Sequence, residues 1–316
     1  MSPSPHPESQ PGPRLNALTS LRFGAAAMVV LSHVGGHFGL PGGFTRPFNL
    51  AQGVTFFFVL SGFILTWVYP TLGHVGPTAF WRARIARIWP GHLAALALFL
   101  LLFHVLPRSW TGLEITPLLA NAVLVHAWIP APAYYASFNV PSWSLSDELL
   151  FYLVFPLLIR NWNRTWWIKL AGALGLAWGL FACLNAVAAW NGRHLAYTHP
   201  LARLPEFVFG MSLPLIVRWA GSRAAPGRRM ATLIEAATVT LVVLAMAGSG
   251  FLARAAVRRY AWLGDAGETW LGLDGALCVP FFGLLIVVMA LERGRSRASC
   301  PGGASCSWAR SATPST

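Results

Sequence analysis

The sequence predicts an all-α protein, a polytopic bundle of transmembrane helices. Of its 316 residues, 55% are hydrophobic and only 10% are charged, whereas roughly 25% of the residues of a soluble domain are charged. The apolar residues form long runs, and the arginines lie in the short stretches between them. Basic residues in short loops are typical of the cytoplasmic side of a membrane protein. The net charge of +13 therefore reflects membrane topology, and we expect no nucleic-acid partner.

Eight or nine apolar segments are expected to form helices in a lipid bilayer. They lie near residues 21–38, 50–69, 89–106, 117–130, 147–160, 167–190, 203–219, 231–251 and 275–291. A full crossing needs about 20 residues. The segment 117–130 is too short for this, so we expect it to be re-entrant or interfacial.

The basic loops support this assignment and set the orientation. If 117–130 does not cross, four basic stretches lie on the side of the N-terminus: 82–87, 160–169, 218–229 and 293–297. That side is then the cytoplasmic one. On the opposite side the rule has three exceptions, namely Arg254, Arg258 and Arg259.

The two ends of the chain differ in composition from the membrane domain, which is expected at 14–292. Residues 1–13 are polar and rich in proline, as in a disordered cytoplasmic lead. No cleavable signal peptide is expected, because the first apolar run is itself the first span. Residues 293–316 form a polar, irregular tail.

Arg22 and His33 are eleven positions apart on an otherwise apolar helix. Eleven residues make about three turns, so both side chains share one face about 16 Å apart. Arg22 is then expected near a membrane surface and His33 near the middle. An ionisable side chain at that depth is a candidate for function. The alternative is an arginine that snorkels to the interface and a histidine that is hydrogen-bonded in the bundle.

A basic cluster lies within the sequence FWRARIARIWP at 80–90. Arg84 and Arg87 are three residues apart and share a helix face, with Arg82 nearby. Such a cluster often serves only to set topology. It could also hold phosphates, because a guanidinium forms bidentate hydrogen bonds to phosphate oxygens.

The segment 141–156 carries a second polar group. Asp147 and Glu148 open an apolar helix, where acidic side chains stabilise the helix dipole and Ser144 could cap the first turn. Alternatively, Ser144, Glu148 and Tyr152 recur every four residues and line one face of the helix. A carboxylate, a hydroxyl and a phenol on one face form a plausible general acid/base site.

Three further expectations concern an ion pair, a helix crossing and metal binding. Arg203 and Glu206 are three residues apart at the start of the seventh run and are expected to pair. The small residues Ser61 and Gly62 are expected to allow a close approach of two helices. We expect no metal site, because His33 and His37 have no evident third ligand.

With these motifs, the chain resembles the acyltransferase 3 family of bacterial integral-membrane O-acyltransferases. Five motifs in the family's order, over roughly residues 15–291, carry the resemblance: Arg22-x10-His33, FFFVLSGF at 56–63, Arg84-Ile-Ala-Arg87-Ile-Trp-Pro90, Trp143-Ser-Leu-Ser-Asp-Glu148 with Tyr152 and Pro156, and RLPEFVFGM at 203–211.

The resemblance implies a bundle of about ten membrane helices that moves an acyl group from cytoplasmic acyl-CoA. The group, commonly acetyl, would pass to a hydroxyl of a carbohydrate or glycolipid. His33 would then be the general base or a transient acyl carrier, Arg22 would steady the donor or the developing charge, and Glu148 would orient or deprotonate. Arg84 and Arg87, with Arg82 beside them, would hold the phosphates of CoA. Further substrate-site candidates are Ser144, Asp147, Tyr152, Arg203 and Glu206. Acyl-CoA is a substrate here, and no permanently bound cofactor is expected.

The chain departs from the family pattern in its last residues. The family usually continues with further helices, the next often carrying a Gly-x-x-Ser-Tyr stretch, so the resemblance implies a truncated C-terminus. A natural disordered tail explains residues 293–316. A frameshift near residue 299 also explains them, because another frame of a GC-rich gene permits an apolar stretch with Gly-Glu-x-Ser-Tyr.

Three functions follow from these observations. The leading hypothesis is an O-acyltransferase in the bacterial cytoplasmic membrane that acts on a cell-surface acceptor. The second is an inactive, truncated homologue. The third is a proton-coupled transporter, in which buried histidine and glutamate relay protons. The sequence does not predict an oligomeric state.

Overall fold

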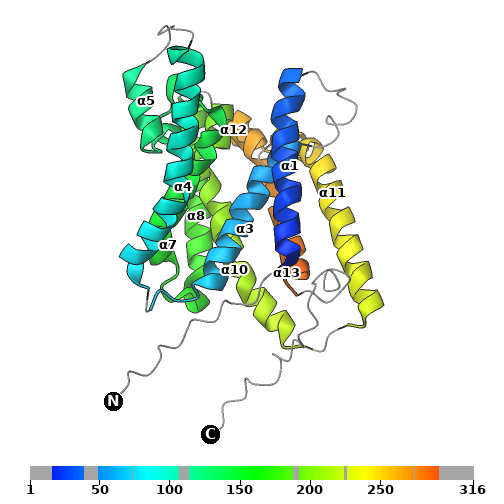
Figure 1. Ribbon diagram of the computed structural model, residues 1–316. Helices are drawn as coiled ribbons and strands as arrows, with labels where there is room; N and C mark the ends of the chain where they lie inside the picture. Colours follow the sequence, from blue (N-terminus) through cyan, green and yellow to red (C-terminus); the bar gives the residue numbers. More distant parts are fainter. Residues whose placement is uncertain are drawn as a thin grey trace, which may run out of the picture.

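The computed structural model describes residues 16–38, 49–73, 75–106, 114–187, 192–223, 226–273 and 275–291. Within these ranges every regular element is a helix, so the predicted all-α class is confirmed (Figure 1). The expected lead at 1–13 and the tail at 293–316 lie outside the described residues, as does the side chain of His37.

The helices of the described ranges have the following bounds. In chain order they are α1 (Asn16–Phe38), η1 (Leu50–Gln52), α3 (Gly53–Val68), α4 (Gly76–Leu100), η2 (Leu101–Val105), α5 (Ile115–Ala122), η3 (His126–Trp128), α6 (Pro132–Tyr135), η4 (Val140–Ser142), α7 (Trp143–Leu158), α8 (Trp162–Ala186), α9 (Gly192–Thr198), α10 (Pro200–Gly221), α11 (Arg228–Arg259), η5 (Ala261–Leu263), α12 (Gly264–Glu268), η6 (Thr269–Leu273), η7 (Ala276–Cys278) and α13 (Val279–Ala290).

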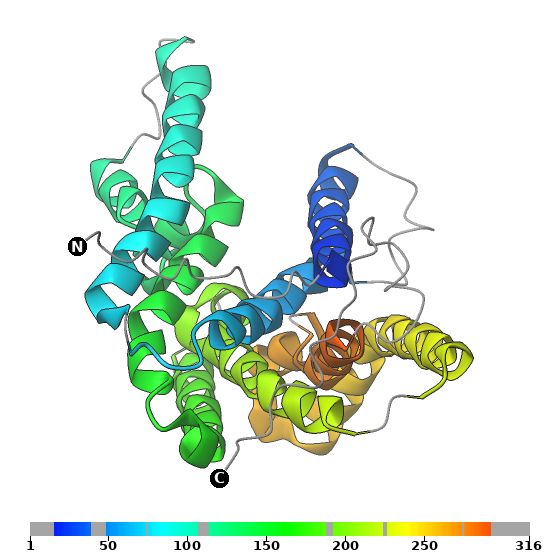
Figure 2. The same ribbon diagram turned by 60° about the horizontal axis from the view of Figure 1, so that its bottom comes forward.

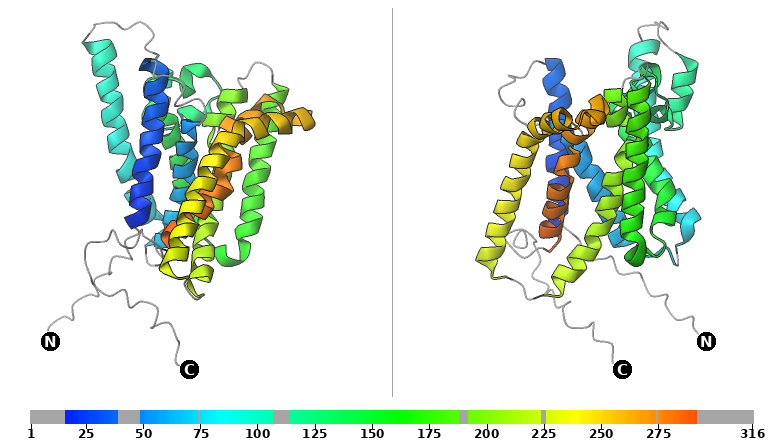
Figure 3. Two further views of the ribbon diagram at one scale, coloured as in Figure 1. Left: turned by 90° about the vertical axis from the view of Figure 1, so that its right-hand side faces the viewer. Right: turned by 180° about the vertical axis from the view of Figure 1, so that it is seen from behind.

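The long helices run alternately up and down between two ends of the molecule. We call the end at which α1 begins the lower end and the end at which it finishes the upper end, as in Figure 1. Helices α4, α8 and α11 begin at the lower end, and α3, α7 and α10 return to it (Figures 1 and 3). This alternation places the arginines of early α4 at the lower end and those of late α11 at the upper end.

Five helices of the described ranges are long and apolar enough to cross a membrane, or six if a bent pair counts as one span. They are Leu50–Val68, Gly76–Val105, Trp162–Ala186, Gly192–Gly221, Arg228–Arg259 and the pair Ala261–Gly272 with Ala276–Ala290, bent by 54°. The chain is thus a multi-pass membrane protein. By this measure the expected count of eight or nine segments is not confirmed: α7 has 16 residues, and in α1 the apolar helix counted is Leu18–Val34.

The segment 117–130 does not form a crossing helix. It holds only the second part of the eight-residue helix α5 and the short η3, and α5 lies beside the upper part of α4 (Figure 1). The chain stays at this end through α6 and η4 before α7 descends. The expectation of a non-crossing segment agrees with this arrangement.

Helices α3 and α10 form the centre of the bundle (Figure 2). In the most apolar stretches of the spans Leu50–Val68 and Gly192–Gly221, 67% and 78% of the residues are buried. The corresponding shares are 17%, 22% and 28% for the spans that contain α4, α8 and α11. These three helices therefore form the periphery, where apolar side chains face outward as lipid contact requires.

Glycine allows the two central helices to touch through their backbones. A Cβ atom on Gly62 of α3 would overlap the carbonyl oxygen of Phe207, and one on Gly210 of α10 would overlap that of Val59. Small residues at crossings are typical of membrane helices, because lipid gives no hydrophobic drive for their association and close packing replaces it. The expected role of Gly62 in close helix approach is confirmed.

Gly62→Ala is expected to separate α3 from α10 and to lower the free energy of unfolding by about 3 kcal/mol, since an overpacked contact against backbone cannot relax by side-chain rotation. The measurement is the midpoint of thermal unfolding of the purified chain in detergent. The matched control is Gly175→Ala on α8, where a Cβ meets no atom within 4 Å. Alanine is the better helix former, so this control should unfold at or above the wild-type midpoint. Equal losses in both variants would contradict the backbone crossing.

Candidate functional site

A cavity of about 520 Å³ opens between α1, α3, α4 and α7. Its wall on α1 and α3 is mostly apolar, whereas α4 and α7 supply polar side chains. Six sequence-predicted site residues line it together: Arg22, Arg84, Arg87, Ser144, Glu148 and Tyr152. The volume lies in the range of small-molecule sites in proteins.

One stripe of α1 faces this cavity. Arg22, Ala26 and Val29 lie on it at helical spacing. His33 continues the same stripe one turn above Val29 but is exposed and lies beyond the cavity lining. The structure therefore places Arg22 inside the cavity and His33 past its upper end, about 16 Å apart along the helix.

The hydrogen bonds of His33 define which ring nitrogen is available. Nδ1 lies 2.8 Å from the carbonyl oxygen of Val29 and 3.3 Å from Oγ of Ser32. A carbonyl can only accept a hydrogen bond, so Nδ1 carries the proton and donates it. In the neutral ring, Nε2 is then left with its lone pair and can accept a proton or attack an acyl carbon.

Arg84 is held in place by aromatic side chains. Its Nη2 donates a hydrogen bond of 2.8 Å to the hydroxyl of Tyr69, and its guanidinium lies 5.2 Å from the centre of that ring and 5.7 Å from that of Phe80. Arg87 lines the cavity one turn further along α4. Arg82 is exposed and is absent from the lining, so the predicted basic cluster divides into two cavity residues and one surface residue.

Glu148 and Tyr152 form the polar centre of the wall on α7. The phenol of Tyr152 donates a hydrogen bond to Oε1 of Glu148. The carboxylate also lies within electrostatic range of Arg22, Arg84 and Arg87. The cavity thus gathers three positive side chains around one hydrogen-bonded carboxylate, an arrangement that can hold an anionic ligand and move a proton.

The helix-capping interpretation of this segment is wrong. Helix α7 begins at Trp143, its N-cap residue is Ser142, and no acidic residue lies in its first turn. The hydroxyl of Ser144 instead donates to the carbonyl of Pro141 at 3.0 Å. Ser144, Glu148 and Tyr152 share the cavity face as their spacing predicts, whereas Asp147 is fully buried elsewhere and does not line the cavity.

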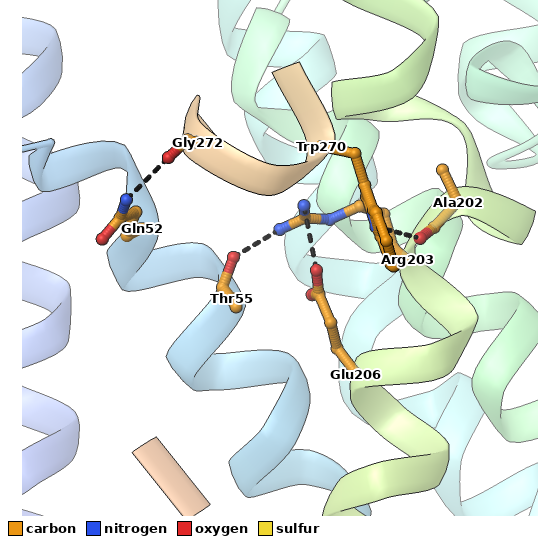
Figure 4. A network of polar contacts seen from close by, with 7 residues as sticks. All are labelled: Gln52, Thr55, Ala202, Arg203, Glu206, Trp270 and Gly272. Atoms are coloured by element: carbon orange, nitrogen blue, oxygen red, sulfur yellow. Dashed lines mark hydrogen bonds and ion pairs between the residues drawn. The ribbon is translucent and has the colours of Figure 1, made fainter. Parts of the chain in front are cut away.

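The predicted pair of Arg203 and Glu206 is confirmed, but it does not line the cavity. The two side chains are fully buried and form an ion pair of 3.1 Å, and Nη2 of Arg203 donates a hydrogen bond of 2.7 Å to Thr55 (Figure 4). The guanidinium also lies 5.3 Å from the ring centre of Phe58, a cavity residue. The pair therefore joins α10 to α3 directly behind the cavity wall.

Sequence reasoning missed a buried polar cluster near the upper end of α4. The rings of His92 and His126 are stacked with centroids 6.5 Å apart. Nε2 of His92 donates a hydrogen bond of 2.8 Å to the carbonyl of Asn121. Nε2 of His126 lies 3.2 Å from Oγ of Ser142. Burial, and after it the neighbouring His92, lowers the pKa of His126 to about 4, so this ring is uncharged at neutral pH.

Tyr69 and Thr55 were missed as well, although they hold Arg84 and Arg203. Tyr69 lies in a turn between two helices, and Thr55 is 148 residues from its partner. No local spacing connects such residues. The only sequence signal is a polar side chain within or next to an apolar run.

The fold and the cavity define a multi-pass membrane protein with a charged site among its helices, as in membrane enzymes and transporters. Residues 15–309 match the family model of the acyltransferase domain, and the chain belongs to this acyltransferase family.

Three curated relatives share part of the sequence. Acyltransferase MdmB of Streptomyces mycarofaciens is 35% identical over 261 residues, which are 73% of this chain and 65% of the relative. Exopolysaccharide production protein ExoZ of Rhizobium meliloti (strain 1021) is 34% identical over 51% of this chain and 49% of its own length. Nodulation protein 10 of Rhizobium leguminosarum bv. viciae is 32% identical over 51% of this chain and 48% of its own length.

The matched part of the chain thus spans less than two thirds of the first relative and about half of the other two. No solved structure matches the chain significantly.

Arg203→Met is expected to destabilise the protein by about 3–5 kcal/mol, because Glu206 would remain buried without its counter-charge. The double variant Arg203→Met/Glu206→Leu removes both charges and should recover most of this loss. The free energies are compared through thermal unfolding of the purified chain. A single variant that is as stable as wild type but inactive would show that the pair acts on substrate and does not hold the helices.

Proposed function

We propose that the protein transfers an acyl group from acyl-CoA to a hydroxyl of a carbohydrate acceptor. The observation that carries the proposal is the cavity in which Arg22, Arg84 and Arg87 surround the Glu148–Tyr152 pair, one helical turn below His33. It combines groups for binding an anionic donor with groups for moving a proton. Membership in the acyltransferase family supports this class of reaction.

The donor is held from the lower end. Arg84 and Arg87 lie in the early part of α4 and Arg22 in the early part of α1, so the cavity is most positive toward this end. Guanidiniums bind phosphate oxygens in bidentate geometry, which suits the phosphates of CoA. The apolar wall of α1 and α3 then accommodates the long, thin arm that carries the thioester upward, toward His33.

The acceptor is approached from the upper end, where His33 is exposed. Nε2 of His33 takes the proton of the acceptor hydroxyl as its oxygen attacks the thioester carbonyl. The C–S bond breaks, the CoA thiolate leaves and receives that proton, and the acyl oxygen ester remains on the acceptor. Arg22, about 16 Å from His33 along the helix, adds to the positive charge that holds the anionic donor, and Glu148, with Tyr152, keeps the arginines oriented.

Two observations support the class of acceptor and the orientation of the chain in the membrane. Two relatives are named for exopolysaccharide production and for nodulation, and the first of these names supports a saccharide acceptor. The basic residues of early α4 and of the α10–α11 ends lie at the lower end, which supports a cytoplasmic lower end and a bacterial cytoplasmic-membrane location. The donor then binds from the cytoplasm and the acceptor from the other side.

His33→Ala is expected to abolish acyl transfer, because no other described side chain on the α1 stripe above the cavity supplies a base. The assay follows label from acetyl-CoA into membrane glycan in cells that express the full chain. A wild-type protein that transfers no label would identify an inactive homologue. A His33→Ala protein that still transfers label would contradict the role of His33 as the base. Label that stays on the wild-type protein after rapid quenching would instead identify an acyl-histidine intermediate.

Arg84→Gln and Arg87→Gln are expected to raise the KM for acetyl-CoA by about tenfold each, the cost of one charge-assisted hydrogen bond. Arg82→Gln is the matched control, since Arg82 has the same charge on the same helix but lies outside the cavity. Its KM should stay within about twofold of wild type. Equal effects of all three variants would show a general surface potential and no phosphate site in the cavity.

A further inference from the structure

A second polar cavity lies on the other side of α3, near the upper end of α11. Its volume is about 310 Å³, and its lining comes from α9, α11, α12 and η6, with Asn49 just before η1. It shares no lining residue with the first cavity. Its charged and polar members are Asn49, Arg193, Ser249, Arg254, Glu268 and Thr269. We call it the upper cavity.

The floor of the upper cavity is a built hydrogen-bond network. The buried side chain of Gln52 donates through Nε2 to Oγ of Ser249 and to the carbonyl of Gly272, both at 2.8 Å (Figure 4 draws the second bond). Ser249 and Gly272 both line the cavity. The bonds tie η1, α11 and η6 together, so the cavity wall is held by side chains buried in the protein.

Arg254 is the cation that this cavity leaves available. Its Nη1 lies 3.5 Å from the position that a Cβ on Gly250 would take, so the guanidinium folds over a glycine that itself lines the cavity. Among the described residues no ion pair joins Arg254 to a carboxylate. Arg193, at the rim, is by contrast paired with Asp265 at 3.2 Å.

The charges select the chemistry of the ligand. A guanidinium favours a carboxylate or a phosphate, whereas the carboxylate of Glu268 repels a bare anion and accepts hydrogen bonds from hydroxyls. A ligand that satisfies both carries an acidic group and several hydroxyls. The upper end of the bundle carries Arg254, Arg258 and Arg259, although basic residues are disfavoured on that side. A role in ligand binding explains why Arg254 is present there.

The upper cavity lies within reach of the first. Asn49 lines the upper cavity and Val54 lines the first, and five residues of η1 and α3 rise about 9 Å between them. A saccharide that carries its acidic unit in the upper cavity can therefore place a neighbouring unit near the first cavity and the stripe of His33.

We propose that the upper cavity is an acceptor subsite that binds an acidic sugar unit through Arg254 and Glu268. This proposal rests on the proposed function, because it identifies the bound unit as part of the acceptor. Arg254 holds the acid group and Glu268 a hydroxyl, while the transferred acyl group enters at the other cavity.

The test uses the purified full chain in neutral detergent, with glucuronate, glucose and inorganic phosphate as probes and thermal stabilisation as the readout. Glucuronate is expected to stabilise the wild type more strongly than glucose or phosphate. Arg254→Gln should weaken the apparent affinity for glucuronate about tenfold, and Glu268→Gln should weaken it while leaving the response to phosphate undiminished. Arg259→Gln is the control, since that guanidinium lies 5.3 Å from the ring centre of Tyr260, outside the cavity lining.

A second arm distinguishes a lipid headgroup from an acceptor sugar. The same variants are reconstituted in bilayers of phosphatidylcholine alone or with phosphatidylglycerol. Stabilisation by phosphatidylglycerol that depends on Arg254, without a response to glucuronate, would overturn the acceptor subsite, as would equal losses in Arg254→Gln and Arg259→Gln. Because binding is measured without acyl-CoA, absence of acyl transfer in the wild type would remove the proposed function but would not alter this readout.

Discussion

The direct backbone contact of α3 with α10 is the constraint on which the other features depend. Because Gly62 and Gly210 lack side chains, the two helices touch and exclude any residue between them. Thr55 is thereby brought to Arg203, and Phe58 comes to lie over the same guanidinium. A wider crossing would separate the buried ion pair from its hydroxyl partner and loosen the wall of the first cavity.

Two polar cavities of the described residues have separate linings. The first cavity lies between α1, α3, α4 and α7 and collects arginines around Glu148. The upper cavity is lined by α9, α11, α12 and η6 and contains Arg254. The peripheral helices α4, α8 and α11 expose most of their residues, since few of them are buried. Charged groups in a membrane protein are costly unless they face the bundle interior, and the first cavity gives Arg22, Arg84 and Glu148 a shared polar site among the helices.

Local spacing predicted the parts of the site that lie on one helix. The four-residue repeat of Ser144, Glu148 and Tyr152 and the three-residue step from Arg203 to Glu206 follow from helical geometry alone, and both are found. Spacing could not distinguish Arg82 from Arg84, because that depends on where Tyr69 and the cavity lie. It also could not pair Thr55 with Arg203 or Gly62 with Phe207, since contacts between distant segments leave no periodic trace. For the same reason, spacing could not predict that Asp147 is buried away from the cavity.

The residues that hydrogen-bond to η1 and α3 are synthesised long after these two helices. Thr55 precedes Arg203 by 148 residues, and Gln52 precedes Gly272 by 220. At about 5–20 residues per second, the ribosome needs about 7–30 s to produce Arg203 after Thr55. During that interval Thr55 has yet to meet Arg203, Gln52 has yet to meet Ser249 and Gly272, and Gly62 has yet to meet α10. The first half of the chain is therefore synthesised before the helices that complete its polar contacts exist.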